Sequence, residues 1–423
     1  MSHSDLRKTY KISKNTIDNG LEVYVIPKTN VPLVTVNLAY RVGSYDEYPD
    51  KSGMAHLFEH LMFEGTKAHP KGEFDLLCSV SGGTNNAYTI YDFTSYYMTL
   101  PANKLDLALY LESDRMKEFA LSEETLANQK KVVTEEIMQT VEEQPYGKWR
   151  ELLADIAYSK ECGYRTEVHG LIDHVRNVTI DDCRDFFNCY YKPANAVLIV
   201  SGNVDPDEVF KKADKHFSHI KSDKRPDDKL FLPEYRFGNT SASFSENVPL
   251  NGVFLSFHFD GLNIDEGIQA DILSNIAGVG RSSRLYSSLV YDRQIASQVG
   301  CYTDKRFRSS LFTLYAIVNK PTVNIETLNE NLQDEISKLK KKITTKELAK
   351  AKAQLSTLVA YELQKTSGIA DLALNSLLFN NDISKFFELP NKINSVTIEE
   401  LKDFADRIFC TENEVRINAL MAE

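Results

Sequence analysis

Alternating apolar and polar residues along the chain predict several strands that bury one face. The predicted strands span residues 21–26, 34–40, 88–100 and 196–201. The turn signal Asn19-Gly20 precedes the first of them. We therefore expect an opening strand pair from residues 21–26 and 34–40.

Helical periodicity predicts long helices at 102–119 and 122–141. A shorter helix is predicted where Met54, Leu57 and Leu61 form one apolar stripe after Ser52-Gly53. Strands and helices thus mix along the chain, which indicates an α+β fold.

A weak internal repeat divides the chain. Val178-Thr-Ile-Asp-Asp182 returns as Val396-Thr-Ile-Glu-Glu400, 218 residues later, and the same offset places Val34 on the apolar run at 252–257. A polar stretch with a proline, residues 221–229, reads as a linker. We expect two similar α/β-type domains, each a mixed sheet packed with helices, at 1–222 and 230–423. Coincidence between two common helix starts is the alternative.

Composition narrows the class of protein. Apolar residues make up 42% and charged residues 26%, and the net charge is -11. This acidity argues against nucleic acid and against anionic membranes as partners. Six scattered cysteines without a C-x-x-C pair fit free thiols, and neither a secretory signal nor a run of about 18 apolar residues is visible. We expect a cytoplasmic protein.

The segment HLFEHLMFEG, residues 56–65, has the residue types of a metal site. His56 and His60 are four residues apart, so on a helix both imidazoles can reach one ion, and zinc suits such ligands. Glu59 can lean over the same face as a general base for a water molecule at the metal. The order H-x-x-E-H is the inverse of the usual zinc-protease order. The alternative is a pair of ordinary packing histidines.

A third ligand is expected from the helix at 122–141. Its apolar stripe leaves Glu135 facing solvent and turns Glu136 toward the packed side. A charge there needs a partner, and a metal ion would serve. A salt-bridged acid at the edge of the core is the alternative.

These residues resemble the M16 metallopeptidases, the inverzincin group that includes half-size bacterial members and the mitochondrial processing peptidase. The resemblance covers nearly the whole chain. It rests on GMAHLFEHLMFEGT at 53–66, GGTNNA at 82–87, NQKKVVTEE at 128–136 and GRSSRLY at 280–286.

The resemblance implies zinc held by His56, His60 and Glu136, with Glu59 as the base. It implies that Asn86 and Ala87 lie on an edge strand that pairs with an extended peptide. Family members pair two half-size chains, or two halves of one chain, around a closed chamber. That chamber limits substrates to peptides and unfolded polypeptide segments.

The chain departs from the family pattern in its second half. Active members have an Arg and a Tyr there, seven positions apart, and the corresponding residues here are Val290 and Ser297. We therefore expect a heterodimer in which a related M16 chain supplies the Arg–Tyr pair. The alternative is a homodimer that uses other residues. The nearby candidates are Arg281, Arg284, Tyr291 and Arg293.

Smaller points stay open. Gln129 stands where many relatives have an outer-shell acid, which could weaken ligand orientation. Manganese or cobalt could replace zinc. A catalytically silent scaffold of the same fold is the main alternative function, and a zinc hydrolase of non-peptide substrates is a third.

Overall fold

The computed structural model describes residues 10–226 and 239–422. These residues form two compact units. Unit 1 contains residues 10–136, 166–226 and 360–388, and unit 2 contains residues 137–165, 239–359 and 389–422. The expected ranges 1–222 and 230–423 therefore differ from the units in two segments, 137–165 and 360–388, each of which packs with the unit of the other half. The predicted linker lies partly outside the described residues.

The sheet of unit 1 has six strands in the order β1-β2-β6-β3-β5-β4. Its strands are β1 Ser13–Thr16, β2 Glu22–Pro27, β3 Leu33–Tyr40, β4 Thr84–Thr89, β5 Thr94–Pro101 and β6 Ala196–Gly202. The strands at 21–26, 34–40 and 196–201 are thus confirmed.

Two strand predictions were wrong in detail. The strands at 21–26 and 34–40 do not pair with each other, because β6 lies between them and β1 is the antiparallel neighbour of β2. The single strand at 88–100 is two strands, β4 and β5, which pair in antiparallel fashion. A turn separates them, in which the Ile90 N–H donates to the Phe93 carbonyl.

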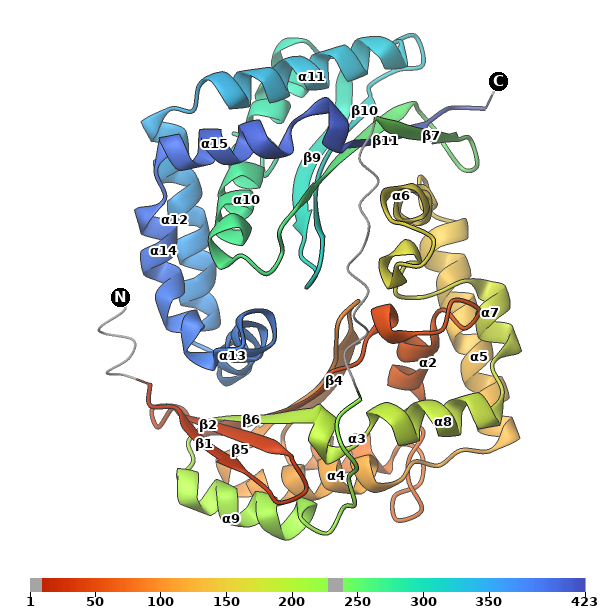
Figure 1. Cartoon of the computed structure of the whole chain (residues 1–423), viewed down its shortest axis with the longest axis vertical. Helices are drawn as coiled ribbons and strands as arrows, with labels where there is room; N and C mark the ends of the chain where they lie inside the picture. The colour runs from red at the N-terminus through yellow and green to blue at the C-terminus, as the bar shows by residue number, and fades with distance from the viewer. Residues whose placement is uncertain (1–9, 227–238, 423) are drawn as a thin grey trace. The chain divides into compact units, whose positions relative to one another are not determined.

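Helices cover both faces of this sheet. Figure 1 shows α4 (Leu105–Lys117) and α9 (Pro206–Phe217) on one face and α13 (Thr366–Asn380) on the other. Thr35 of β3 bonds to Thr366 of α13 at 2.8 Å between hydroxyl oxygens. The remaining longer helices of unit 1 are α2 Met54–Leu61, α3 Glu73–Val80, α5 Glu123–Ile137 and α8 Ile180–Tyr190.

Unit 2 repeats this plan with the strand order β7-β11-β8-β10-β9. Its strands are β7 Thr240–Phe244, β8 Gly252–Phe259, β9 Ala296–Asp304, β10 Ser310–Val318 and β11 Glu414–Ala419. Its longer helices are α6 Trp149–Ala157, α10 Ile264–Ala277, α11 Ile325–Lys341, α12 Thr345–Glu362 and α15 Ile398–Ile408. The offset of 218 maps α8 onto α15 residue for residue, and both begin with a capping box, at Thr179 and Thr397. The predicted duplication is confirmed.

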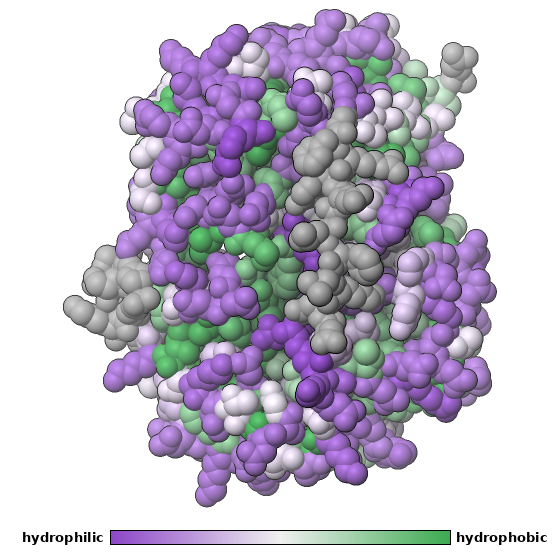
Figure 2. All heavy atoms as spheres, viewed as in Figure 1, coloured by the Kyte–Doolittle hydropathy of each residue, from purple (hydrophilic) through white to green (hydrophobic). Residues whose placement is uncertain are grey.

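Polar residues dominate the visible surface in Figure 2. All six cysteines are unpaired thiols. Within the described part of the chain, no helix is both long and apolar enough to cross a membrane.

Candidate metal centre

Helix α2 holds the two histidines of the motif, and its start is fixed by backbone contacts. Gly53 at the N-cap has a left-handed φ of 88°, and a Cβ there would lie 2.6 Å from the His169 carbonyl oxygen. Only glycine fits such a position without strain. Because glycine has no side chain to cap the helix, the carboxylate of Glu47 accepts hydrogen bonds from the N–H groups of Gly53 and Ala55, at 2.8 and 2.7 Å.

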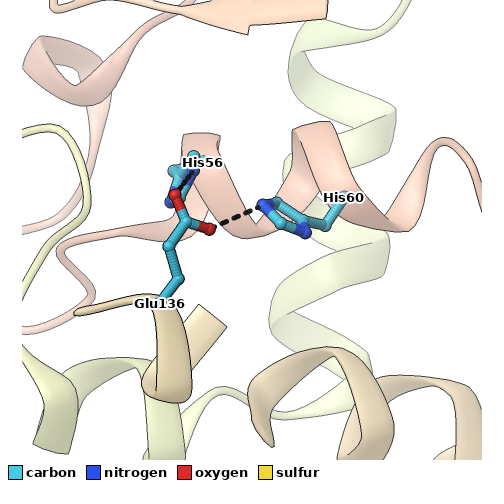
Figure 3. Close-up of side chains that lie close together, drawn as sticks. All are labelled: His56, His60 and Glu136. Carbon is cyan, nitrogen blue, oxygen red and sulfur yellow. Dashed lines mark ion pairs between the residues drawn. The ribbon is translucent and has the colours of Figure 1, made fainter. Parts of the chain in front are cut away.

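His56, His60 and Glu136 meet at one point, as Figure 3 shows. Glu136 lies on α5, and its two carboxylate oxygens face the two imidazoles separately. Oε1 is 3.8 Å from His56 Nε2, and Oε2 is 3.4 Å from His60 Nε2. The possible ligand atoms, one from each residue, all lie within 4.8 Å of one another. The spacing therefore brings together the three residues expected from the sequence, while Glu135 is exposed.

The donor set fits a zinc ion. Two ligand atoms each about 2.1 Å from a tetrahedral ion lie about 3.4 Å apart. The two His–Glu distances, 3.4 and 3.8 Å to different carboxylate oxygens, are close to that separation. The donors, two imidazole nitrogens and one carboxylate oxygen, are the ligand types that catalytic zinc uses.

The protonation states also suit metal ligation. Burial, together with the neighbouring His60, lowers the pKa of His56 to about 4, so this imidazole is neutral at pH 7. The hydrogen bond with His60 lowers the pKa of Glu136, which keeps the carboxylate charged. A metal ion binds such deprotonated groups without first displacing a proton.

Glu59 lies beside this donor set on the same helix and is half-buried. Its Oε2 accepts a hydrogen bond from the Thr89 hydroxyl at 2.6 Å. Burial raises the pKa of Glu59, and the bond from Thr89 opposes that rise. A carboxylate with a raised pKa accepts a proton more readily than an ordinary exposed carboxylate, which suits a general base. The sequence analysis missed Thr89, because the contact joins residues from a helix and a strand that are 30 positions apart.

Asn86 and Ala87 lie on β4, the edge strand of the unit 1 sheet. They stand opposite Tyr97 and Tyr96 of β5, so one side of β4 is paired. Helix α2 packs next to β4. The edge position expected for these two residues is present, and the histidine helix lies beside it.

Gln129 is buried on α5, and its side-chain amide donates to Glu64 Oε1 at 2.6 Å. Lys71 Nζ lies 2.5 Å from the same oxygen. Gln129 thus contributes to a polar cluster around Glu64.

Val290 and Ser297 behave as structural residues of unit 2. Val290 packs against the apolar core of that unit. The Ser297 hydroxyl donates to the Val318 carbonyl at 2.9 Å.

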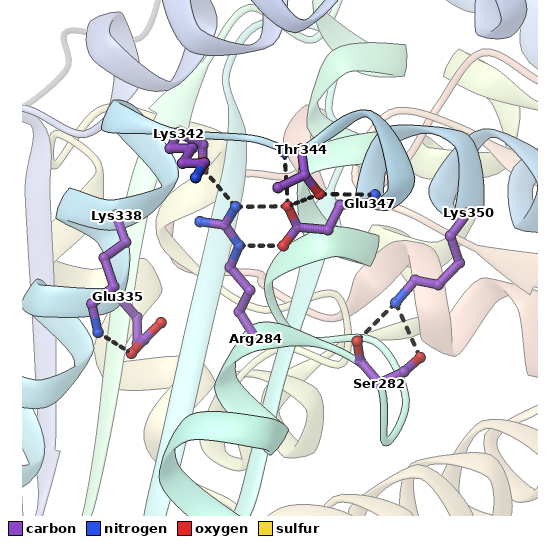
Figure 4. Close-up of polar contacts among 8 residues, drawn as sticks. All are labelled: Ser282, Arg284, Glu335, Lys338, Lys342, Thr344, Glu347 and Lys350. Atoms are coloured by element: carbon purple, nitrogen blue, oxygen red, sulfur yellow. Dashed lines mark hydrogen bonds and ion pairs between the residues drawn. The ribbon is translucent and has the colours of Figure 1, made fainter. Parts of the chain in front are cut away.

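Two of the basic residues near these positions, Arg284 and Arg293, are also held in ion pairs. Arg284 binds both carboxylate oxygens of Glu347 at 2.6 and 2.9 Å and donates to the Lys342 carbonyl, as Figure 4 shows. Arg293 pairs with Asp334 at 2.9 Å. Tyr291 is 74% exposed, and Arg281 is exposed.

Comparison with known proteins identifies relatives over nearly the whole chain. The family model "Insulinase (Peptidase family M16)" matches residues 23–167, and "Peptidase M16 inactive domain" matches residues 177–355. The zinc protease PqqE of Helicobacter pylori is 31% identical over 399 residues, which cover 93% of this chain and 89% of that protein. The beta subunit of the bovine mitochondrial-processing peptidase is 25% identical over 399 residues, which cover 92% and 80% of the two chains.

Among solved structures, a protease from Helicobacter pylori superposes with a TM-score of 0.92 at 29% identity, covering 97% of this chain and 99% of that one. Both halves of the chain thus match the two M16 domain types in order. The chain belongs to peptidase family M16.

Proposed function

We propose that this protein is a zinc-dependent endopeptidase that hydrolyses peptides or unfolded polypeptide segments. The observation that supports this most directly is the convergence of His56, His60 and Glu136 within 4.8 Å, with Glu59 on the same helix. In this proposal the first three residues hold zinc and Glu59 is the general base. The name "zinc protease" borne by several relatives agrees with it.

The roles follow from the chemistry of each group. When bound, zinc lowers the pKa of water at the site and polarises the scissile carbonyl. Glu59 accepts the proton of the attacking water as the new C–O bond forms. It then passes that proton to the amine nitrogen as the C–N bond breaks. The edge of β4 at Asn86 and Ala87 holds the substrate by main-chain hydrogen bonds, which give affinity without requiring one sequence.

The second subunit completes this proposal. Val290 and Ser297 offer no cationic or phenolic donor, and Arg284 and Arg293 are held in ion pairs within unit 2. We therefore expect a related M16 chain with an Arg–Tyr pair as the partner in a chamber-forming heterodimer. A second copy of this chain is the alternative. Because unpaired thiols favour a reducing compartment, we propose the cytoplasm as the location of the enzyme.

The test combines metal analysis with peptide cleavage. We expect about one zinc per wild-type chain, the same content in Glu59→Gln, and none in His60→Ala. Chelator-sensitive cleavage of an internally quenched peptide above the Glu59→Gln blank would establish the peptidase. If the zinc-loaded chain is silent alone, addition of the partner should restore cleavage. A wild-type chain without zinc would instead favour a silent scaffold.

A further inference from the structure

The edge strand β4 ends at a residue that touches the proposed base. The Thr89 hydroxyl donates to Glu59 Oε2 at 2.6 Å. Hydrogen bonds to a charged group are shorter and stronger than neutral ones. Glu59 has several rotatable bonds, so without a donor its carboxylate could take several positions.

Strand β4 is itself held on both faces at this end. Successive side chains of a strand point to opposite faces. Thr89 faces α2, and the preceding residue, Tyr88, donates its hydroxyl to Asp371 Oδ1 of α13 at 2.7 Å. The amide of Asn375 lies 3.2 Å from the other oxygen of Asp371. Hydrogen bonds on both faces therefore hold this end of β4, and precise positioning of a reactive group requires such support.

Substrate and base share this strand in the proposed function. Thr89 lies two residues beyond Ala87, about 7 Å along β4. A peptide bound at Ala87 and the Glu59 carboxylate held by Thr89 would both be positioned by the same strand, so their relative position would be fixed. A small displacement of Glu59 relative to the peptide would slow the reaction, because proton transfer needs hydrogen-bond geometry.

We propose that Thr89 is a positioning residue, which fixes the carboxylate of Glu59 relative to the peptide-binding edge of β4. This inference rests on the proposed function. It concerns the placement of Glu59 and leaves the metal ligands unaffected.

Three substitutions separate this role from general stability. Thr89→Val keeps the shape of the side chain and removes the hydroxyl, whereas Thr89→Ser keeps the hydroxyl. Thr99→Val is the matched control, because Thr99 lies on the neighbouring strand β5 and its hydroxyl bonds to that of Thr35 at 2.8 Å. It removes a threonine hydroxyl hydrogen bond from the same sheet without touching Glu59.

The first measurement is structural and independent of turnover. Crystal structures of the zinc-loaded chain and its variants should show the Glu59 carboxylate displaced, or split between conformers, in Thr89→Val alone. Zinc content should be equal in all of them. A Glu59 side chain that stays in place in Thr89→Val would overturn the inference. A wild-type chain that takes up no zinc would contradict the proposed function instead.

The second measurement is turnover of a quenched peptide by the wild-type chain and by each variant. The partner chain is added if the wild-type chain is silent alone. We expect Thr89→Val to lower kcat by about tenfold to a hundredfold, a loss no larger than the roughly 10²–10⁴-fold that general acid–base catalysis contributes as a whole, with KM within about twofold. Thr89→Ser should recover most of that loss, and Thr99→Val should stay near wild type. A rise in KM with unchanged kcat, or a Ser variant as slow as the Val variant, would contradict a positioning role.

Discussion

Helix α2 of unit 1 and helix α10 of unit 2 occupy related places in two copies of one fold, yet only α2 contributes to the candidate metal centre. The positions 218 residues after His56, Glu59 and His60 are Ser274, Ala277 and Gly278. The position after Glu136 is Gln354 on α12. Thus α10 and α12 have small or neutral residues where α2 and α5 have two imidazoles and two carboxylates.

Space differs between the two regions as much as chemistry does. Ser274 is 5% exposed and Ala277 is fully buried. A Cβ on Gly278 would lie 2.5 Å from the Cys301 nitrogen of β9. By contrast, the side chains of His56 and His60 are 14% and 25% exposed. The duplicated fold is thus stable without the site. In unit 2 close packing replaces it.

The largest expected effect, on zinc affinity, comes from a substitution that gives a position of unit 1 the residue found at the equivalent position of unit 2. Glu136→Gln reproduces Gln354 and keeps nearly the same shape, but it removes the charge that faces both histidines. We expect zinc affinity to fall about a thousandfold or more, beyond the tenfold to hundredfold loss typical of outer-shell changes. Competition with a coloured chelator measures the affinity.

Far-ultraviolet circular dichroism is the control for that variant, because the comparison of α2 with α10 predicts an unchanged fold. Glu135→Gln is the matched substitution, since Glu135 is exposed on the same helix. Equal zinc affinity in wild type and Glu136→Gln would exclude Glu136 as a ligand.

The next prediction tests whether residues 360–388 belong to unit 1 and residues 137–165 to unit 2. Leu374 of α13 is fully buried in unit 1, and Leu153 of α6 is 5% exposed in unit 2. Each leucine substituted by alanine should cost about 2–5 kcal/mol of unfolding free energy. Leu374→Ala, although in the C-terminal half of the sequence, should lower the urea concentration at which zinc is released. Leu153→Ala should mainly affect probes of unit 2. The opposite assignment would contradict the composition of the units.

A smaller effect is expected from the caps of the two helices. Asn263 caps α10 itself, because its Oδ1 accepts from Asp265 and Glu266 N–H groups, whereas α2 depends on Glu47. Glu47→Ala and Asn263→Ala should each cost about 1 kcal/mol of unfolding free energy. Only Glu47→Ala should also weaken zinc binding, by up to about tenfold, because it loosens the helix that contains both histidines. Equal zinc affinity in the two variants would show that this cap does not orient the ligands.

The convergence of His56, His60 and Glu136 was predictable because its signal is local and chemical. His56 and His60 are spaced by one helical turn, and the position of Glu136 follows from the apolar stripe of its helix. The duplication was predictable because Thr179 and Thr397 start equivalent helices with the same capping chemistry.

The remaining features depend on contacts between distant segments. The turn at 90–93 lies within a continuous run of strand-forming residues, so only the pairing of β4 with β5 reveals it. The insertion of β6 between β2 and β3 pairs β6 with a strand more than 150 residues earlier in the sequence. The roles of Glu47 and Thr89 have the same origin, since each acts on α2 from outside the helix.

The smallest expected effect is a pH dependence that belongs to unit 2. Burial alone would raise the pKa of Glu347, but hydrogen bonds from Arg284 and Thr344 outweigh it and lower the pKa from 4.5 to about 2. Between these values the unfolded chain binds a proton that the folded chain does not, so stability falls as the pH decreases. Thermal midpoints of the metal-free protein, measured between about pH 5 and pH 3, should decline less in Glu347→Gln than in wild type. Parallel declines would show that this ion pair does not contribute to acid sensitivity. The Glu135→Gln chain is the reference, because it removes an exposed carboxylate from unit 1 instead.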